Sequence, residues 1–231
     1  MTTDLAHGIT LVTGTDTDVG KTVATAVFAS HLAQRGVDVV VCKPTQTGVV
    51  GDEPGDAATV VALAGLPSNR VLEFVRLPEP LAPTTAGRRA GVPLPGVAQH
   101  AARIARLAEE HEAVLVEGAG GVRVGLDDEG RDLLDLADAL AAAGTPCRFV
   151  VVARAGLGSL NHTALTCDAI RSRGHEVTRL VVGSLPDEPD LAERCNLSEL
   201  PQAAGLTTLI ALPSGLGSDT ARLRDLARSI A

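Results

Sequence analysis

A run of small, polar and acidic residues that ends in Gly-Lys-Thr has the composition of a phosphate-binding loop. The run is GTDTDVGKT, residues 14–22, and it lies between an apolar segment, ITLVT (9–13), and a stretch typical of a helix (20–36). Such loops commonly read G-x-x-x-x-G-K-[ST], and their backbone amides and helix dipole hold the phosphates. Here the first glycine, Gly14, stands one position too early. The sequence therefore predicts a phosphate loop outside the commonest subclass.

The side chains of this loop indicate how a nucleoside triphosphate and a metal ion bind. Lys21 can reach the β- and γ-phosphates, and the Thr22 hydroxyl can coordinate Mg²⁺. Asp16 and Asp18 make the loop more acidic than a triphosphate needs, and short acidic side chains can cap backbone amides in turns. The loop lacks the early second lysine of chromosome-partitioning ATPases, and the chain lacks the Asn-Lys-x-Asp stretch used to recognise guanine.

A second lysine stands at the end of another apolar segment. Lys43 follows VDVVVC (37–42) and begins the sequence KPTQTG (43–48). The carboxyl ends of parallel strands meet at one edge of an α/β sheet, and ligands bind there. A lysine at this edge, followed by the hydroxyls of Thr45 and Thr47, is placed to face the terminal phosphate of a nucleotide. The alternative is a surface lysine, which the phosphate loop on the preceding strand disfavours.

Acidic residues near the same edge are candidates for metal ligands. Glu117 ends the apolar segment AVLVE (113–117), and a carboxylate at a strand tip can hold Mg²⁺ directly or through water. The glycines after it let phosphate or substrate approach the backbone. Asp52, Glu53 and Asp56 precede a predicted helix. Because acids favour helix starts without any function, these three are weaker candidates.

Alternating strands and helices are needed to position these residues. Further strands are predicted at 148–153, 177–183 and 207–212, and helices at 20–36, 56–65, 97–112, 132–142, 160–173 and 219–230. Continuous Val, Leu and Ile runs indicate strands buried on both faces, as in parallel sheets. We expect a three-layer α/β fold of the P-loop NTPase kind, with a mostly parallel sheet flanked by helices. Residues 1–231 are expected to form a single domain, with Val23, Val27 and Leu32 facing the sheet and Asp127–Glu129 in a solvated turn.

Composition disfavours several classes of function. The 231 residues carry a formal net charge of −8, with no Trp, no Tyr and no long basic run, so we expect no nucleic-acid partner. No apolar run has membrane-spanning length, and the N-terminus does not resemble a secretion signal, so we expect a cytoplasmic protein without membrane contact. The cysteines are far apart and are expected to be small buried residues in a reducing compartment. They are Cys42, Cys147, Cys167 and Cys195.

Four motifs, in this order, resemble the dethiobiotin synthetase family of the biotin pathway: GTDTDVGKT, KPTQTG, VEGAGG and LGSLNHTALT. The family's loop reads G-T-D-T-x-V-G-K-T, so the early glycine is a family feature, and the resemblance runs from about residue 9 to 215. It implies a homodimer that makes dethiobiotin from 7,8-diaminopelargonate, carbon dioxide or bicarbonate, and a nucleoside triphosphate with Mg²⁺. A related amide synthase and a nucleotide-switch NTPase are alternatives, but the first usually carries a glutaminase domain and the second an early lysine or a Cys/His patch.

The resemblance also implies roles for individual residues. Lys43 and Lys21 would be the catalytic lysines, and Thr22, Asp56 and Glu117 the magnesium residues. Asp56 is chosen because it directly precedes the helix that ends in LAG. The residues expected to bind the nucleotide are Asp18, Val19, Gly20, Lys21, Thr22, Val23, Asp56, Glu117, Gly118, Ala119, Gly120, Gly183, Ser184, Pro213, Ser214 and Gly215. Those expected to bind the substrate are Thr17 and Thr47, with Gly158, Ser159, Leu160 and Asn161 receiving its carboxylate tail across the dimer interface.

One departure from the family concerns the nucleotide base. Many members carry Ala-Asn after a later strand, and that asparagine reads the adenine edge. Gly183 and Ser184 stand at this place. Serine does not offer the paired donor and acceptor of an amide. We therefore expect weak selectivity for adenine, with ATP usable and a pyrimidine triphosphate such as CTP as a candidate for the preferred nucleotide.

Overall fold

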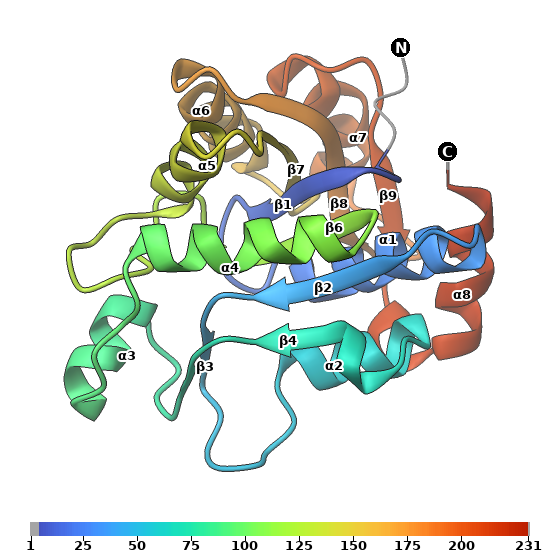
Figure 1. The fold of residues 1–231 in the computed structure, drawn as a ribbon. Coiled ribbons are helices and arrows are strands. Elements are labelled where there is room, and N and C mark those ends of the chain that lie inside the picture. The colour runs from blue at the N-terminus through green and yellow to red at the C-terminus, as the bar shows by residue number, and fades with distance from the viewer. Residues whose placement is uncertain (1–4, 231) are drawn as a thin grey trace.

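The computed structural model describes residues 5–230, and its main element is a seven-stranded sheet in the order β4-β2-β6-β1-β7-β8-β9 (Figure 1). All neighbouring strands in it are parallel. The strands are β1 (Gly8–Gly14), β2 (Val39–Lys43), β4 (Val71–Glu73), β6 (Ala113–Gly121), β7 (Cys147–Ala153), β8 (Glu176–Leu185) and β9 (Ile210–Pro213). The predicted α/β fold, a mostly parallel sheet flanked by helices, is confirmed.

Helices cover both faces of the sheet, and a hydrophobic cluster fills the space under each layer. One layer contains α1 (Lys21–Gln34), α2 (Asp56–Ala64) and α8 (Thr220–Ser229). The other contains α4 (Val97–Glu110), α5 (Leu133–Ala142), α6 (Ser159–Ser172) and α7 (Leu191–Ala203). In α1, Val27 and Leu32 are buried as expected, whereas Val23 is only half-buried. Strands covered on both faces account for the continuous apolar runs of the sequence.

Alternation along the strands decides on which face the charged side chains lie. In β2, Val41 packs in the cluster under α1, while Cys42 packs in the opposite cluster. Side chains of a strand alternate with a period of two, so the next residue, Lys43, lies on the α1 side. In β6, Leu115 packs under α1, and the same period places Glu117 there as well. The two charged residues therefore share one face at the carboxyl edge.

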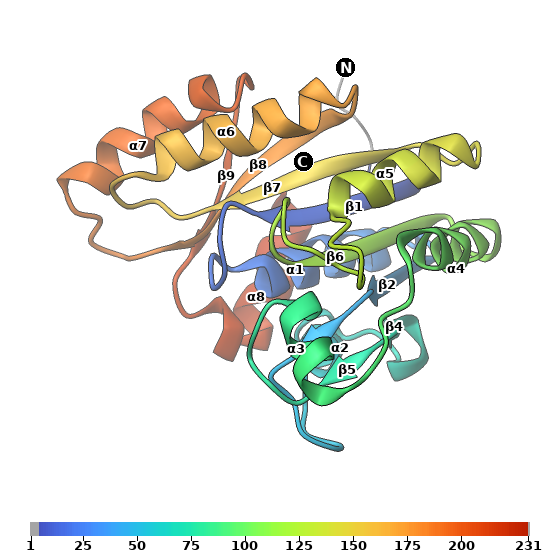
Figure 2. The ribbon, with the colours of Figure 1, turned by 90° about the vertical axis from the view of Figure 1, so that its left-hand side faces the viewer.

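A small second sheet lies beside the main one and was not predicted. It pairs β3 (Gln46–Thr47) with β5 (Arg76–Leu77). Figure 2 shows β5 close to the short helix α3 (Pro83–Ala90), at the bottom of the view. Leu77, Ala86 and Leu94 form its own small core. Strands of two residues are too short to show an alternating pattern, and α3 begins inside a proline-rich stretch.

Two elements near the C-terminus also differ from the predictions. Helix α7 was not predicted, and its sequence contains Pro201 and buries only Asn196 and Leu200. With so few buried residues, it lacks the apolar stripe that identifies a surface helix. Strand β9 begins at Ile210, later than predicted, because the two threonines before it are exposed.

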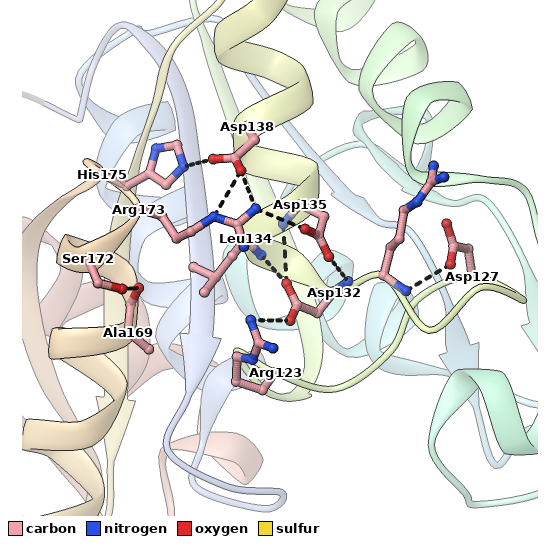
Figure 3. A network of polar contacts seen from close by, with 11 residues as sticks. Arg123, Asp127, Asp132, Leu134, Asp135, Asp138, Ala169, Ser172, Arg173 and His175 are labelled. Carbon is pink, nitrogen blue, oxygen red and sulfur yellow. Dashed lines mark hydrogen bonds and ion pairs between the residues drawn. The ribbon is translucent and has the colours of Figure 1, made fainter.

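An ionic network holds α5 to the end of α6 and the start of β8 (Figure 3). Arg173 pairs with Asp135 at 2.9 Å and also with Asp138, and His175 lies 2.7 Å from Asp138. At the start of α5, Asp132 accepts hydrogen bonds from the first backbone amides of the helix. The network therefore joins α5, which follows the loop after β6, to the chain between α6 and β8.

The acidic run Asp127–Glu129 was expected to be a solvated turn, and this prediction is wrong for Asp127. Its side chain is buried and accepts hydrogen bonds from the amides of Val97, Glu129 and Arg131 at 2.9–3.1 Å. Three amide donors replace the water that an ionised carboxylate loses on burial. Asp127 therefore joins the loop after β6 to the start of α4.

The expectation that the cysteines are buried is correct for only some of them. Cys42 and Cys167 are buried and Cys147 is half-buried, but Cys195 is exposed on α7, so the expectation of burial is wrong for it. All four thiols are free. Within residues 5–230, every helix is too short or too polar to span a lipid bilayer.

Candidate active site

The predicted phosphate loop joins β1 to α1, and the structure explains its early glycine. The ammonium group of Lys21 donates a hydrogen bond to the carbonyl of Asp16 at 2.9 Å, close to Gly14. A Cβ atom at Gly14 would lie 2.6 Å from that carbonyl and 3.0 Å from the Lys21 nitrogen. Gly20, with φ of 95°, precedes the first helical residue. The loop thus requires glycine at both places, once for space and once for backbone conformation.

The end of β8 packs against the backbone of this loop. A Cβ atom at Gly183 would lie 2.0 Å from the carbonyl oxygen of Val19, and one at Gly20 would lie 2.7 Å from the carbonyl of Gly183. Both contacts are shorter than nonbonded carbon and oxygen atoms allow. Glycine at 183 therefore lets β8 approach the phosphate loop backbone to backbone.

Four side chains from four elements meet beside the loop, and we call them the lysine–carboxylate cluster: Thr22, Lys43, Asp56 and Glu117. The Nζ atom of Lys43 lies 2.8 Å from Oε1 of Glu117 and also donates to the carboxylate of Asp56. The Thr22 hydroxyl donates to the same Glu117 oxygen at 2.9 Å. Lys43 is 7 % exposed and Glu117 2 %, whereas the Asp56 side chain is 36 % exposed.

The charges in this cluster set the protonation of Lys43 and influence that of Lys21 beside it. Burial alone would lower the pKa of Lys43, but the adjacent carboxylates of Glu117 and Asp56 raise it above its ordinary value. Lys43 therefore stays positively charged. For Lys21, burial lowers the pKa, and the positive charge of Lys43 adds to this effect, while Glu117 and Asp56 oppose it. Two buried lysines of different basicity thus lie beside the phosphate loop.

The oxygen atoms of the cluster fit a magnesium ion. Thr22 supplies a hydroxyl, and Asp56 and Glu117 supply carboxylates, all of which are hard oxygen ligands. Within residues 5–230, no three His, Cys, Asp or Glu side chains are grouped to hold a metal by themselves. Mg²⁺ usually takes one or two carboxylates from a protein and completes its shell with water and substrate phosphates. The donor set therefore matches a metal bound together with a nucleotide.

Two further residues at this site were not singled out from the sequence. The side-chain oxygen of Gln46 accepts a hydrogen bond from the amide of Asp56 at 2.9 Å, and Glu73 accepts one from the amide of Ala57 at 3.2 Å. Gln46 lies within the KPTQTG motif, which was a signal that could have been used. Glu73 ends a strand too short to be recognised, so nothing in the sequence marked it.

The threonines proposed near the substrate lie in different surroundings. The carbonyl of Thr17 accepts a hydrogen bond from Arg154, which follows β7, at 2.9 Å. The Thr17 hydroxyl would lie 3.5 Å from a Cβ atom at Gly120, so the phosphate loop and the end of β6 are adjacent. Thr47 is half-buried on β3. Thr45 is buried, and its hydroxyl has no hydrogen-bond partner among the described residues.

The two segments predicted to enclose the base are brought together. The amide of Ser214 donates to the carbonyl of Leu185 at 2.7 Å, so residues 213–215 lie beside the end of β8. Ser184 is exposed there. The structure thus places one exposed hydroxyl at this corner of the sheet, next to the glycine that contacts the phosphate loop.

The segment 158–161, predicted to receive the tail of the substrate, begins α6. Gly158 adopts φ of 90° before the helix, and Ser159 is buried while Asn161 is exposed. Asn196 of α7 fixes the preceding loop, because its amide donates to the carbonyl of Ala155 at 2.7 Å and to the Ser159 hydroxyl at 3.2 Å. Across the described part of the chain, no hydrogen bond or ion pair joins this segment to the lysine–carboxylate cluster.

Solved structures of distant sequence share the fold. A ParA family ATPase from Chlorobium tepidum TLS aligns with a TM-score of 0.56 at 13% identity, over 98% of this chain and 94% of that one. Chloroplast FtsY from Physcomitrella patens aligns with a TM-score of 0.53 at 14% identity, over 98% of this chain and 67% of that one. At such low identity the likeness concerns the architecture alone.

Sequence comparisons are more specific. The model of the AAA domain family matches residues 9–220. A protein of Rhodococcus jostii (strain RHA1) is 50% identical over 90% of this chain and 87% of its own length, and one of Saccharopolyspora erythraea is 49% identical over 96% and 94%. A protein of Streptomyces avermitilis is 50% identical over 91% and 85%. All three are named ATP-dependent dethiobiotin synthetase BioD. The chain therefore belongs to the family of ATP-dependent dethiobiotin synthetases.

Proposed function

We propose that this chain is a ligase that converts 7,8-diaminopelargonate, carbon dioxide and a nucleoside triphosphate into dethiobiotin. The observation that carries the proposal is the lysine–carboxylate cluster, in which buried Lys43 contacts both Asp56 and Glu117 beside the phosphate loop. The names of the relatives supply the reaction, and the cluster supplies charges suited to it.

Each part of the nucleotide has a place in this proposal. The amides of residues 18–23 at the start of α1 would bind the phosphates, since a helix N-terminus favours anions. Residues 118–120, at the end of β6, would lie close to the phosphates, because glycine and alanine leave the backbone accessible. Thr22, Asp56 and Glu117 would hold the metal, and bound Mg²⁺ neutralises phosphate charge.

The central difficulty of the reaction is repulsion between anions. One amine of the substrate forms a carbamate with carbon dioxide, and the carbamate must attack the γ-phosphate. Two unit charges about 4 Å apart repel by about 4 kcal/mol at an effective dielectric constant of about 20. Lys43 remains charged because Glu117 and Asp56 raise its pKa. Lys43 and Lys21 together would offset the repulsion and stabilise the negative charge that moves to the leaving diphosphate.

The bonds change in two steps. A carbamate oxygen forms a bond to the γ-phosphorus while the bond to the nucleoside diphosphate breaks, which gives a carbamic–phosphoric anhydride. The second amine then attacks the carbonyl carbon, the bond to phosphate breaks, and the cyclic urea closes. A carbamate is already a nucleophile, so the first step needs no general base. Most of the remaining acceleration would come from positioning the reactants.

We also propose that the chain works as a homodimer, with residues 158–161 of one protomer receiving the substrate tail of the other. Two exposed leucines support this arrangement. Leu157, just before the segment, is 93 % exposed, and Leu165, shortly after it, is 60 % exposed. Apolar surface of this kind is what a second protomer would cover.

Thr17 and Thr47 would contact the substrate between the phosphate loop and β3. We further propose that residues 1–231 form one domain and that the protein is cytoplasmic, in line with four free thiols.

The base of the nucleotide would lie between Ser184 and residues 213–215. Selectivity for adenine would be weak, because a serine hydroxyl does not offer the paired donor and acceptor of an amide.

A phosphate-release assay tests the proposal. The protein is given diaminopelargonate, bicarbonate, Mg²⁺ and one nucleoside triphosphate at a time, and dethiobiotin is identified by mass. We expect release of phosphate in a one-to-one ratio with dethiobiotin and only in the presence of the diamine. Release that ignores the diamine would instead indicate a nucleotide-switch NTPase.

A further inference from the structure

The Asp56 side chain is much more exposed than those of Lys43 and Glu117, so its position needs support from outside the cluster. It is the first residue of α2, and the residue before it, Gly55, has no side chain with which to cap the helix. The first amides of a helix have no partners within the helix. Whatever binds them therefore sets the direction in which Asp56 projects.

Gln46 binds the first of these amides. Its Oε1 atom accepts the hydrogen bond from Asp56, and its Nε2 atom donates to the carbonyl of Thr47 at 2.8 Å. Gln46 is buried, and its backbone pairs with Arg76 in the small sheet. Both polar atoms of its amide group are thus hydrogen-bonded. Gln46 therefore connects the small sheet to the start of α2.

Glu73 binds the second amide. It lies opposite Lys43 in the pairing of β4 with β2, and its Oε1 atom accepts the hydrogen bond from Ala57. Its other oxygen forms an ion pair with Arg76. That pairing balances the charge of Glu73, so that a second carboxylate can lie near Asp56 with less mutual repulsion.

The side chains of Gln46 and Glu73 both fill the space next to Gly55. A Cβ atom at Gly55 would lie 2.6 Å from the Glu73 oxygen and 3.0 Å from the side-chain carbon Cδ of Gln46. Gly55 has φ of −98°, which any residue can adopt. A larger residue at position 55 would therefore push these two side chains away from the helix start. Arg76 also donates to the carbonyls of Gly51 and Glu53, which holds the loop leading to Gly55.

We propose that Gln46 and Glu73 are positioning residues for the metal: they hold the first turn of α2 so that the Asp56 carboxylate stays directed at the cluster. The inference rests on the proposed function, in which Asp56 binds Mg²⁺. Groups that orient metal ligands typically contribute about 10- to 100-fold to metal affinity or activity. We expect an effect at the lower end, because Asp56 keeps its contact with Lys43.

The test measures metal binding directly. Mn²⁺ stands in for Mg²⁺, and its free fraction is measured by electron paramagnetic resonance in the presence of a non-hydrolysable ATP analogue. The variant Gln46→Met has a similar length but lacks the accepting oxygen. Its control is Gln99→Met, because Gln99, although exposed, also accepts a backbone amide at a helix start, that of Gly96 at 2.9 Å before α4. Glu73→Met removes the second acceptor, and Glu73→Gln restores one oxygen.

We expect Gln46→Met and Glu73→Met to weaken Mn²⁺ binding about ten-fold, while Gln99→Met binds like the unmodified protein and Glu73→Gln recovers most of the affinity. Hydrogen exchange should show faster exchange at the start of α2 in Gln46→Met and at the start of α4 in Gln99→Met. Unchanged Mn²⁺ binding in Gln46→Met despite faster exchange in α2 would overturn the inference, as would an equal loss in Gln99→Met. If the unmodified protein binds no Mn²⁺ with the nucleotide, the metal site itself is wrong, and the inference fails with it.

Discussion

The Nζ atom of Lys43 lies 2.8 Å from Oε1 of Glu117, and both side chains are almost completely buried. The same oxygen accepts the Thr22 hydroxyl, so one carboxylate joins the phosphate loop, the second strand and β6. A buried charge is stable only while its partner is present. The residue proposed for catalysis is therefore also part of what holds this edge of the sheet together, and its replacement should affect both activity and stability.

Lys43→Met should abolish most of the turnover while the protein still folds. Without the positive charge of Lys43, the repulsion between the carbamate and the γ-phosphate is no longer offset. We therefore expect kcat to fall at least about 100-fold, as when one group that stabilises transition-state charge is removed. The free energy of unfolding should also fall, by about 3 kcal/mol, because Glu117 loses its charged partner. Phosphate release and urea denaturation followed by circular dichroism measure the two effects.

Adding Glu117→Gln to Lys43→Met separates the two roles of the lysine. The neutral amide no longer needs a charged partner, so the double variant should regain much of the lost stability while remaining inactive. Equal stability of the single and double variants would show that the unpaired charge of Glu117 is not the cause of the lost stability. Near-normal turnover in Lys43→Met would exclude the lysine from catalysis.

Gly183→Ala should damage nucleotide binding although no side chain is lost. The new methyl group would meet the carbonyl of Val19 at 2.0 Å, so β8 and the phosphate loop have to separate. Overpacking of this kind costs about 1–3 kcal/mol, and we expect a lower melting temperature and about a ten-fold higher KM for the nucleotide. Gly96→Ala is a matched control, since a Cβ atom there meets nothing within 4 Å. A KM equal to that of the control would mean that the loop adapts freely.

The Gly183 contact also illustrates what the sequence did and did not predict. The phosphate loop, the strand that ends in Lys43 and the strand that ends in Glu117 were all found, because a parallel sheet brings the ends of buried strands to one edge. The tight approach of β8 to the loop was not found. Position 183 was interpreted only as part of a base pocket, because a contact between two backbones leaves no pattern other than a glycine.

The choice among the three acids before α2 shows the same limit. Spacing alone left Asp52, Glu53 and Asp56 equivalent, and the resemblance to a family selected Asp56. In the structure Asp56 contacts Lys43, while Asp52 is exposed. The supports of Asp56 were missed because Gln46 acts on a backbone amide ten residues away. The sequence at the start of a helix does not indicate which distant side chain accepts hydrogen bonds from its first amides.

Nucleotide choice should respond to a single substitution. Ser184→Asn would place an amide donor and acceptor at the corner of the sheet proposed to hold the base. We expect the ratio of kcat/KM for ATP to that for CTP to rise about ten-fold, which corresponds to roughly 1.4 kcal/mol of new hydrogen bonding. The unmodified protein should use both nucleotides. Strict dependence on ATP before the substitution, or no change after it, would place the base elsewhere.

His100, on α4, should make the protein sensitive to acid. Its ring is fully buried, stacks on Phe74 and has no hydrogen-bond partner for either nitrogen among the described residues. Burial and, to a smaller extent, the nearby Arg103 lower the pKa of His100 to about 4, against the opposing effect of Asp127. The unfolded chain takes up this proton near pH 6.5, so the free energy of unfolding should fall as the pH drops from about 6.5 to 4, by up to about 3 kcal/mol.

His100→Leu should flatten that pH dependence in urea denaturation, whereas His7→Gln, at an exposed histidine, should not. A slope unchanged by His100→Leu would assign the acid sensitivity to the carboxylates instead.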